Sequence, residues 1–236
     1  MPGEAGVPHD DELPSFKERM RRAAHALLDP LVSALAAIGV RPDHLTVAGL
    51  GLSVVASIAF FEGGFRFAAL LLILAGVCDI LDGQLARRRG AVSRFGAFLD
   101  STLDRLSDGI VLAGIAGYYM AHLLDLVIDP RQAVAEISRG LEPRTWAVVS
   151  LTAITALILS YLVSYTRARA EGLGLDCKVG WFERPERMVV IIVAALLGVG
   201  PGMPAALLIL AALSLVTAIQ RVTHVWKITR GAGMDR

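Results

Sequence analysis

Three long stretches of the sequence contain no charged residue, and they constrain the fold more than any other feature. Residues 45–61, 145–166 and 188–220 run for 17, 22 and 33 positions without Asp, Glu, Lys or Arg. A helix needs about 20 mostly apolar residues to cross the hydrocarbon core of a bilayer. Gly200, Pro201 and Gly202 interrupt the longest stretch, which favours two helices there. The chain is therefore predicted to be an integral membrane protein.

The rest of the hydropathy pattern predicts an all-α fold with one surface helix and six transmembrane helices. We place the spans at residues 43–62, 66–89, 93–124, 144–171, 183–199 and 203–228. Before them, residues 15–39 combine helically spaced apolar residues with a basic flank, which is typical of an amphipathic juxtamembrane helix. Residues 1–13 are polar and predict a flexible cytosolic tail, and residues 14–236 form a single membrane domain. We expect the 124–143 segment to be a long outer loop.

The distribution of charge predicts the orientation. The chain has 23 basic and 22 acidic residues, and a net charge of +1 gives no support for a nucleic-acid partner. The positive-inside rule favours cytosolic termini. That topology leaves only four basic residues outside, namely Arg66, Arg131, Arg139 and Arg144. The sequence thus predicts a multi-pass protein of the cell (inner) membrane, with both termini and the active site in the cytosol.

Four aspartates lie within predicted spans, where a charged carboxylate is costly and indicates a functional site. Asp79 and Asp82 are three residues apart and Asp100 and Asp104 are four apart, so each pair shares a helix face. A short turn joins the two helices, which lets the four carboxylates converge. Oxygen ligands without His or Cys suit Mg²⁺ or Mn²⁺, and two such ions suit phosphoryl transfer. The alternative, structural ion pairing with nearby arginines, does not explain four acids among small residues.

These residues form the pattern Asp79-x2-Asp82-Gly83-x2-Ala86-Arg87-x8-Gly96-x3-Asp100-x3-Asp104. The pattern resembles the signature of the CDP-alcohol phosphatidyltransferase family, whose members have a juxtamembrane helix followed by six spans. The resemblance implies transfer of a phosphatidyl group from CDP-diacylglycerol to an alcohol, with release of CMP. It also implies that the four aspartates hold two divalent metals, that Asp104 is the general base, and that the protein is a homodimer. Positions that match the family's CDP-lipid site are Asp43, Thr46, Gly83, Arg87 and Ser93, and the small residues Ala86 and Gly96 let the ligand approach the backbone.

The acceptor is predicted from the second half of the chain. Residues 164–171, 183–187 and 220–226 resemble the phosphatidylinositol phosphate synthase branch of the family, which implies inositol 1-phosphate as the acceptor. The matching phosphate-binding positions are Ser164, Arg167, Arg187 and Arg221. On spacing alone, each arginine fits a membrane anchor of the positive-inside type better than a ligand, and the local motifs shift the prediction toward phosphate binding.

Two alternatives remain at this point. Glycerol 3-phosphate is another anionic acceptor, and it would make the protein a phosphatidylglycerophosphate synthase. An ion or proton transporter would use buried carboxylates as a relay. A transporter predicts acids spread across the membrane, whereas the four aspartates lie at one depth.

Overall fold

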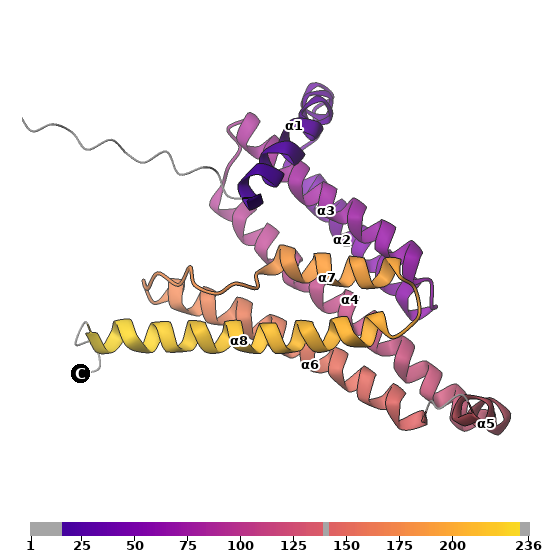
Figure 1. Ribbon diagram of the computed structural model, residues 1–236. Coiled ribbons are helices and arrows are strands. Elements are labelled where there is room, and N and C mark those ends of the chain that lie inside the picture. Colours follow the sequence, from indigo (N-terminus) through magenta and orange to yellow (C-terminus); the bar gives the residue numbers. More distant parts are fainter. Residues whose placement is uncertain (1–15, 139–141, 232–236) are drawn as a thin grey trace, which may run out of the picture.

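The computed structural model describes residues 16–138 and 142–231, and the regular structure within these ranges is entirely helical (Figure 1). The predicted tail at residues 1–13 and Arg139 lie outside the described residues. The helices are α1 (Phe16–Ala37), α2 (Pro42–Phe61), α3 (Phe65–Arg88), α4 (Arg94–Ile128), α5 (Pro130–Ser138), α6 (Pro143–Gly172), α7 (Arg184–Leu196) and α8 (Gly202–Gly231). The predicted all-α fold is confirmed.

Four of the six predicted spans have the length and the hydropathy that crossing a membrane requires. Over the described residues, α2, α4, α6 and α8 are long and apolar enough to cross a membrane. The chain is therefore a multi-pass membrane protein. Helix α7 has only 13 residues, or about 20 Å at 1.5 Å per residue. The spans assigned to α3 and α7 stay predictions.

One expectation from the sequence was wrong. The 124–143 segment is not a long loop, because α4 continues to Ile128 and α5 follows over Pro130–Ser138. The Asp129 carboxylate accepts a hydrogen bond from the Arg131 backbone N–H at 3.0 Å, which is how a cap stabilises a helix start. This helix was not predicted because its nine residues are fewer than the sequence window over which helical periodicity can be recognised.

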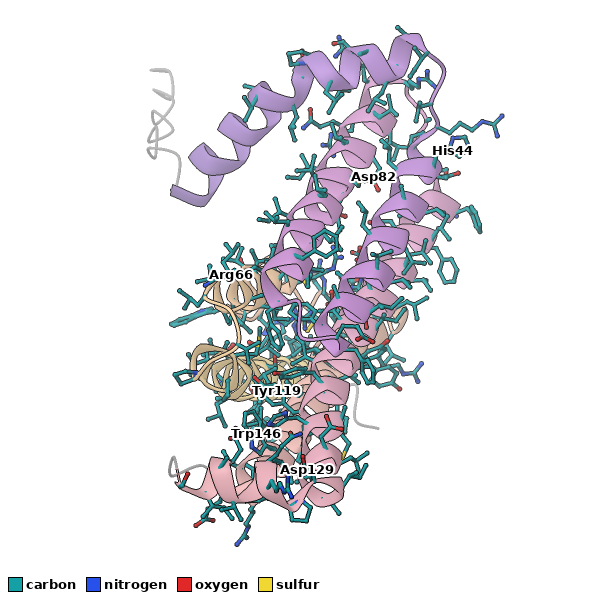
Figure 2. All side chains as sticks on the ribbon, turned by 90° about the vertical axis from the view of Figure 1, so that its right-hand side faces the viewer. His44, Arg66, Asp82, Tyr119, Asp129 and Trp146 are labelled. Carbon is teal, nitrogen blue, oxygen red and sulfur yellow. The ribbon has the colours of Figure 1, made fainter. Side chains whose placement is uncertain are left out.

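The helices pack as a chain of neighbours. Helix α2 contacts α3 and α4, α4 contacts α6, α6 contacts α8, and α7 lies between α3 and α8 (Figure 1). Figure 2 shows α1 lying across the end of the bundle near Asp82 and α5 across the opposite end near Asp129. The two crossing helices thus mark the two ends of the bundle.

Close packing of α2 on α4 fixes the frame around the acidic residues. Gly114 lies so near α2 that a Cβ there would come within 2.4 Å of the Ser57 carbonyl oxygen. The Ser57 hydroxyl donates a hydrogen bond to the Ile110 carbonyl at 2.7 Å. In a bilayer there is no hydrophobic driving force between helices, because the lipid tails are equally apolar. Helices associate instead through close packing at small residues and through interhelical hydrogen bonds of this kind.

Helix α1 is attached to α3 by apolar and ionic contacts. Val32 of α1 packs in a buried cluster with Leu81 and Leu85 of α3. The Asp29 carboxylate pairs with the Arg88 guanidinium at 3.0 Å. The surface helix is therefore held against the same end of α3 that carries Asp82.

Candidate active site

A tight turn brings the two acidic helix faces together. Gly90 has φ +61°, in the left-handed region that glycine adopts without strain, and it lets the chain reverse between α3 and α4. The Ser93 hydroxyl oxygen then accepts a hydrogen bond from the Gly96 backbone N–H at 2.9 Å and caps α4. Helices α3 and α4 consequently run antiparallel, with the four predicted aspartates between them.

Three of the four predicted metal ligands converge. Asp79, Asp82 and Asp100 each offer a carboxylate oxygen, and these oxygens all lie within 4.8 Å of one another. Asp82 is buried and accepts a hydrogen bond from the Thr46 hydroxyl at 2.8 Å. We call Asp79, Asp82 and Asp100 the acid triplet.

The acid triplet fits a divalent cation. Asp100 Oδ1 is buried and has no hydrogen-bond partner among the described residues, which leaves a desolvated acceptor in need of a donor or a metal. Like charges this close repel, and a bound cation removes the repulsion. Oxygen-only ligands match Mg²⁺ and Mn²⁺. The predicted metal centre therefore has a structural basis on α3 and α4.

Asp104, the fourth predicted ligand and predicted base, lies outside the acid triplet. Its carboxylate pairs with the Arg184 guanidinium at 2.9 Å and with Arg105 at 3.6 Å. It nevertheless shares a cavity of about 20 Å³ with Asp79 and Asp82. That volume holds one water-sized group. Asp104 thus faces the same small space as two members of the triplet.

A larger pocket opens beside the acid triplet, and we call it the α2–α4 pocket. Its volume of about 330 Å³ is within the range of small-molecule sites. Two members of the triplet, Asp82 and Asp100, line it. The lining also includes every predicted CDP-lipid position, namely Asp43, Thr46, Gly83, Ala86, Arg87, Ser93 and Gly96. The structure therefore joins all the predicted lipid positions and two of the four predicted metal ligands in one space.

The α2–α4 pocket is suited to an anion. Arg87 is exposed, and its guanidinium lies over Gly83, where an added Cβ would be 3.5 Å from Arg87 Nη1. Ser93 and Gly96 place the N-terminus of α4 on the pocket wall. Helix N-termini present backbone N–H groups and the positive end of the helix dipole to anions. A phosphate in this pocket would meet both sources of positive potential.

The buried arginines of the predicted acceptor site are engaged within the fold. Arg187 and Arg221 are each 3% exposed. Arg187 donates to the Ser160 carbonyl at 3.1 Å and pairs with Asp108 at 3.3 Å. Arg221 donates to the Val163 carbonyl of α6 and to the Val179 carbonyl at 2.9 Å. These two side chains therefore tie α7 and α8 to α6.

The other two predicted acceptor residues lie on the same part of α6. The Ser164 hydroxyl donates to the Ser160 carbonyl at 3.3 Å. Arg167 is partly exposed and pairs with Glu171 at 2.9 Å and with Glu183 at 3.6 Å. All four predicted acceptor residues thus gather around one stretch of α6, and Arg167 is the most accessible of the three arginines.

Two site residues were not selected from the sequence as ligands. Arg184 Nη1 lies 2.9 Å from Asp104 and 3.3 Å from Asp79, and its Nε lies 3.2 Å from buried Asp108. Asp108 follows Asp100 and Asp104 at a spacing of four, and that continuation was the available signal. Arg184 lies in the same short motif as Arg187, and only Arg187 was predicted to bind the acceptor phosphate. The structure places Arg184 nearer to the acidic residues.

The sequence matches one family along most of its length. A family profile described as CDP-alcohol phosphatidyltransferase covers residues 40–226. The chain is 37% identical over 216 residues to an archaetidylinositol phosphate synthase of Methanothermobacter thermautotrophicus, covering 90% of this chain and 95% of the relative. It is 36% identical over 213 residues to a phosphatidylinositol phosphate synthase of Mycobacteroides abscessus, covering 87% and 86%.

Solved structures show the same likeness. The crystal structure of Mycobacterium tuberculosis phosphatidylinositol phosphate synthase with CDP-DAG bound superposes with a TM-score of 0.70 at 30% identity, covering 84% of this chain and 92% of that one. A second crystal structure of that protein, in complex with manganese and citrate, gives a TM-score of 0.68 with coverage of 84% and 88%. The fold and the sequence therefore point to the same group of proteins.

Proposed function

The chain belongs to the CDP-alcohol phosphatidyltransferase family, and we propose that it transfers a phosphatidyl group from CDP-diacylglycerol to inositol 1-phosphate, giving phosphatidylinositol phosphate and CMP. The observation that carries the proposal is the α2–α4 pocket, in which every predicted CDP-lipid position lies beside the acid triplet. The two relatives compared by sequence are named archaetidylinositol phosphate synthase and phosphatidylinositol phosphate synthase, so their names differ in the lipid and share the inositol phosphate. The shared part of the names supports the acceptor.

The donor is proposed to bind with its pyrophosphate in the α2–α4 pocket. Arg87 over Gly83 and the N-terminus of α4 supply the positive potential for that group. Asp82 and Asp100 reach the pocket from the acid triplet. The pyrophosphate would therefore lie between the arginine and the metal ligands, and the CDP-DAG bound by the Mycobacterium tuberculosis relative supports this assignment.

Asp79, Asp82, Asp100 and Asp104 are proposed to hold two Mg²⁺ or Mn²⁺ ions. Bound there, the cations neutralise charge that develops on the pyrophosphate as CMP leaves. The orphaned Asp100 oxygen and the short distances within the triplet support a metal on this face. The manganese in the crystal structure of the Mycobacterium tuberculosis relative is consistent with the choice of ion.

Asp104 is proposed as the general base. It would accept the proton of the acceptor hydroxyl as the hydroxyl oxygen forms a bond to the lipid-linked phosphorus. The bond from that phosphorus to the bridging oxygen of CMP breaks in line with the attack. Its place on the wall of the small cavity, within one helical turn of Asp100, supports this role.

The acceptor phosphate is proposed to bind beside α6. Arg167 is accessible there, and Ser164, Arg187 and Arg221 lie around the same stretch of the helix. Guanidinium groups suit phosphate because they offer paired donors in a planar fork. Arg167 would meet the phosphate directly, while the two buried arginines add positive charge behind it.

The protein is further proposed to sit in the cell membrane with six spans, with α1 at the cytosolic surface and both termini in the cytosol. Asp82 and the basic last turn of α3 lie toward the end of the bundle that α1 crosses (Figure 2). Homodimer formation and a single domain over residues 14–236 belong to the same proposal. Cysteine labelling of Arg131→Cys and Arg230→Cys in intact cells tests the orientation, because only position 131 should react from outside.

An acceptor panel tests the proposed reaction. The purified full-length protein is supplied with CDP-diacylglycerol, Mn²⁺ or Mg²⁺ and one of inositol 1-phosphate, glycerol 3-phosphate, inositol or serine. CMP release should be fastest with inositol 1-phosphate, and mass spectrometry should identify phosphatidylinositol phosphate. Faster turnover of glycerol 3-phosphate would replace the proposed acceptor, and no CMP release with any acceptor would reject the proposal. CDP-archaeol in a parallel reaction compares the two lipid types named for the relatives.

A further inference from the structure

We propose that Arg184 is an internal counter-ion, which holds Asp79 and Asp104 while the metal site is empty and gives them up when a divalent cation binds. The inference rests on the proposed metal site. It assigns Arg184 a positioning role toward the metal ligands.

The geometry places Arg184 where it competes with a metal. One guanidinium nitrogen, Nη1, lies 2.9 Å from Asp104 and 3.3 Å from Asp79, so a single cationic group bridges α3 and α4. Both carboxylates are proposed metal ligands. A guanidinium and a metal ion on the same carboxylate repel each other, because both are positively charged, so each weakens the other's contact with that carboxylate.

The bridge also explains why Asp104 lies apart from the acid triplet. The triplet is formed by the other three aspartates, whose oxygens meet within 4.8 Å. Asp104 is the aspartate in the closest contact with Arg184. Release of that contact would free its carboxylate to turn toward the triplet and complete a set of four ligands.

Arg184 has an anchor that does not depend on the metal ligands. Its Nε pairs with buried Asp108 at 3.2 Å, and Asp108 is held in turn by Arg187 at 3.3 Å. Arg184 is also the first residue of α7, directly after the irregular 173–183 segment, and its side chain is 23% exposed. The Asp108 contact can therefore act as a pivot, about which the Nη1 end moves away while the side chain stays near the site.

Competition of this kind is reciprocal. If Arg184 and the metal both need Asp79 and Asp104, each weakens the binding of the other by the same factor. Removal of Arg184 should therefore tighten metal binding, by about tenfold within the usual range of such couplings. The metal-free protein should at the same time lose stability, because two neighbouring carboxylates lose their shared cation.

The test is a titration of the full-length protein in detergent with Mn²⁺, with free Mn²⁺ measured by electron paramagnetic resonance. We expect Arg184→Gln to bind Mn²⁺ about tenfold more tightly than wild type. Arg105→Gln is the matched control, since Arg105 contacts Asp104 at 3.6 Å but does not bridge to Asp79. The Mn²⁺ affinity of Arg105→Gln should change less than about threefold, because this variant removes one nearby charge and leaves the Arg184 bridge in place.

Thermal unfolding gives a second readout. Without metal, Arg184→Gln should have a lower Tm than wild type, and Mn²⁺ should raise its Tm by more. Equal or weaker Mn²⁺ affinity in Arg184→Gln, or equal tightening in Arg105→Gln, would overturn the inference. If Arg184→Gln does not fold, Arg184→Met serves instead, because it removes the charge and keeps a long unbranched side chain, and an unchanged Mn²⁺ affinity there would overturn the inference.

The two proposals fail in different ways. If wild type binds no Mn²⁺ saturably and releases no CMP, the proposed metal-dependent reaction is at fault. If wild type does both and the Arg184 variants bind Mn²⁺ no more tightly, only the counter-ion role is rejected.

Discussion

In the α2–α4 pocket the cationic side chain, Arg87, is exposed above Gly83, whereas on the α6–α8 side Arg187 and Arg221 are buried and already donate to main-chain carbonyls. The first region presents an open volume of about 330 Å³ to a ligand. The second region uses its arginines to connect three helices. Arginines that are all predicted to bind phosphate therefore differ in their contribution to stability. A buried arginine whose N–H donors already bond to the fold contributes more than an exposed one.

Four variants test this contrast, and the largest effect is expected at Asp104, the proposed general base. Asp104→Asn should lower kcat by about 10³-fold, because an amide cannot accept the hydroxyl proton. CMP release measures the effect, and binding of CDP-diacylglycerol should stay near the wild-type level. Asp125→Asn, an exposed aspartate elsewhere on α4, is the control and should keep full activity. Turnover near wild type in Asp104→Asn would remove Asp104 from the role of base.

The second prediction concerns the buried side of the comparison. Arg187→Ala should reduce the free energy of unfolding by about 3 kcal/mol, because it breaks a buried ion pair with Asp108 and removes the hydrogen bond that ties α7 to the Ser160 carbonyl of α6. In the variant that remains folded, KM for the acceptor should rise much more than KM for the CDP-lipid. Thermal unfolding and initial-rate kinetics check the two parts. An equal rise in both KM values would contradict the acceptor-side assignment, and an unchanged Tm would contradict the structural one.

The third prediction concerns the open side. Arg87→Ala should raise KM for CDP-diacylglycerol by about tenfold, the loss of one charge-assisted contact, while Tm changes little because Arg87 is exposed. Arg131→Ala, an exposed arginine of α5 at the opposite end of the bundle, is the control for charge. A large loss of Tm in Arg87→Ala would break the contrast between an open and a closed region.

The smallest effect is expected at the rim of the α2–α4 pocket. Ser93→Ala should lower the free energy of unfolding by about 1 kcal/mol, because the hydroxyl caps α4 through the Gly96 N–H. Ser93→Asn keeps the cap without adding a charge to the anion pocket and should restore the stability. Thermal unfolding measures both variants. If Ser93→Asn restores Tm but not KM for the CDP-lipid, the hydroxyl also contacts the ligand; restoration of both assigns Ser93 to capping alone.

The helices were largely predictable from the sequence because apolar runs and glycine breaks are local signals. The break at Gly200 and Pro201 is an example, since α7 ends at Leu196 and α8 begins at Gly202. The seven positions predicted for the CDP-lipid came largely from the family resemblance, and the fold brings them into one pocket because most of them lie on two consecutive helices joined by a short turn. Helix α5 was not predicted because its nine residues are too short a segment for helical periodicity to be recognised.

The role of Arg184 was not predictable from spacing. Its contacts with Asp79 and Asp108 join residues 105 and 76 positions apart in the sequence. Which arginine of the 183–187 motif faces the acids depends on how α7 is rotated against α3 and α4. A pattern of residue types along the chain does not contain that rotation, so the sequence alone does not show which of Arg184 and Arg187 contacts Asp79 and Asp104.

The attachment of α1 to α3 has a consequence for how the enzyme meets its lipid. Asp29 holds Arg88, and Arg89 donates to the Ala36 carbonyl, directly beside Arg87 on the wall of the α2–α4 pocket. With α1 resting on the bilayer as proposed, these contacts would fix the height of the α2–α4 pocket relative to the phosphate layer of the membrane. A donor that diffuses within one leaflet would then reach the pocket with its head group level with the acid triplet, so its search for the site would take place in two dimensions.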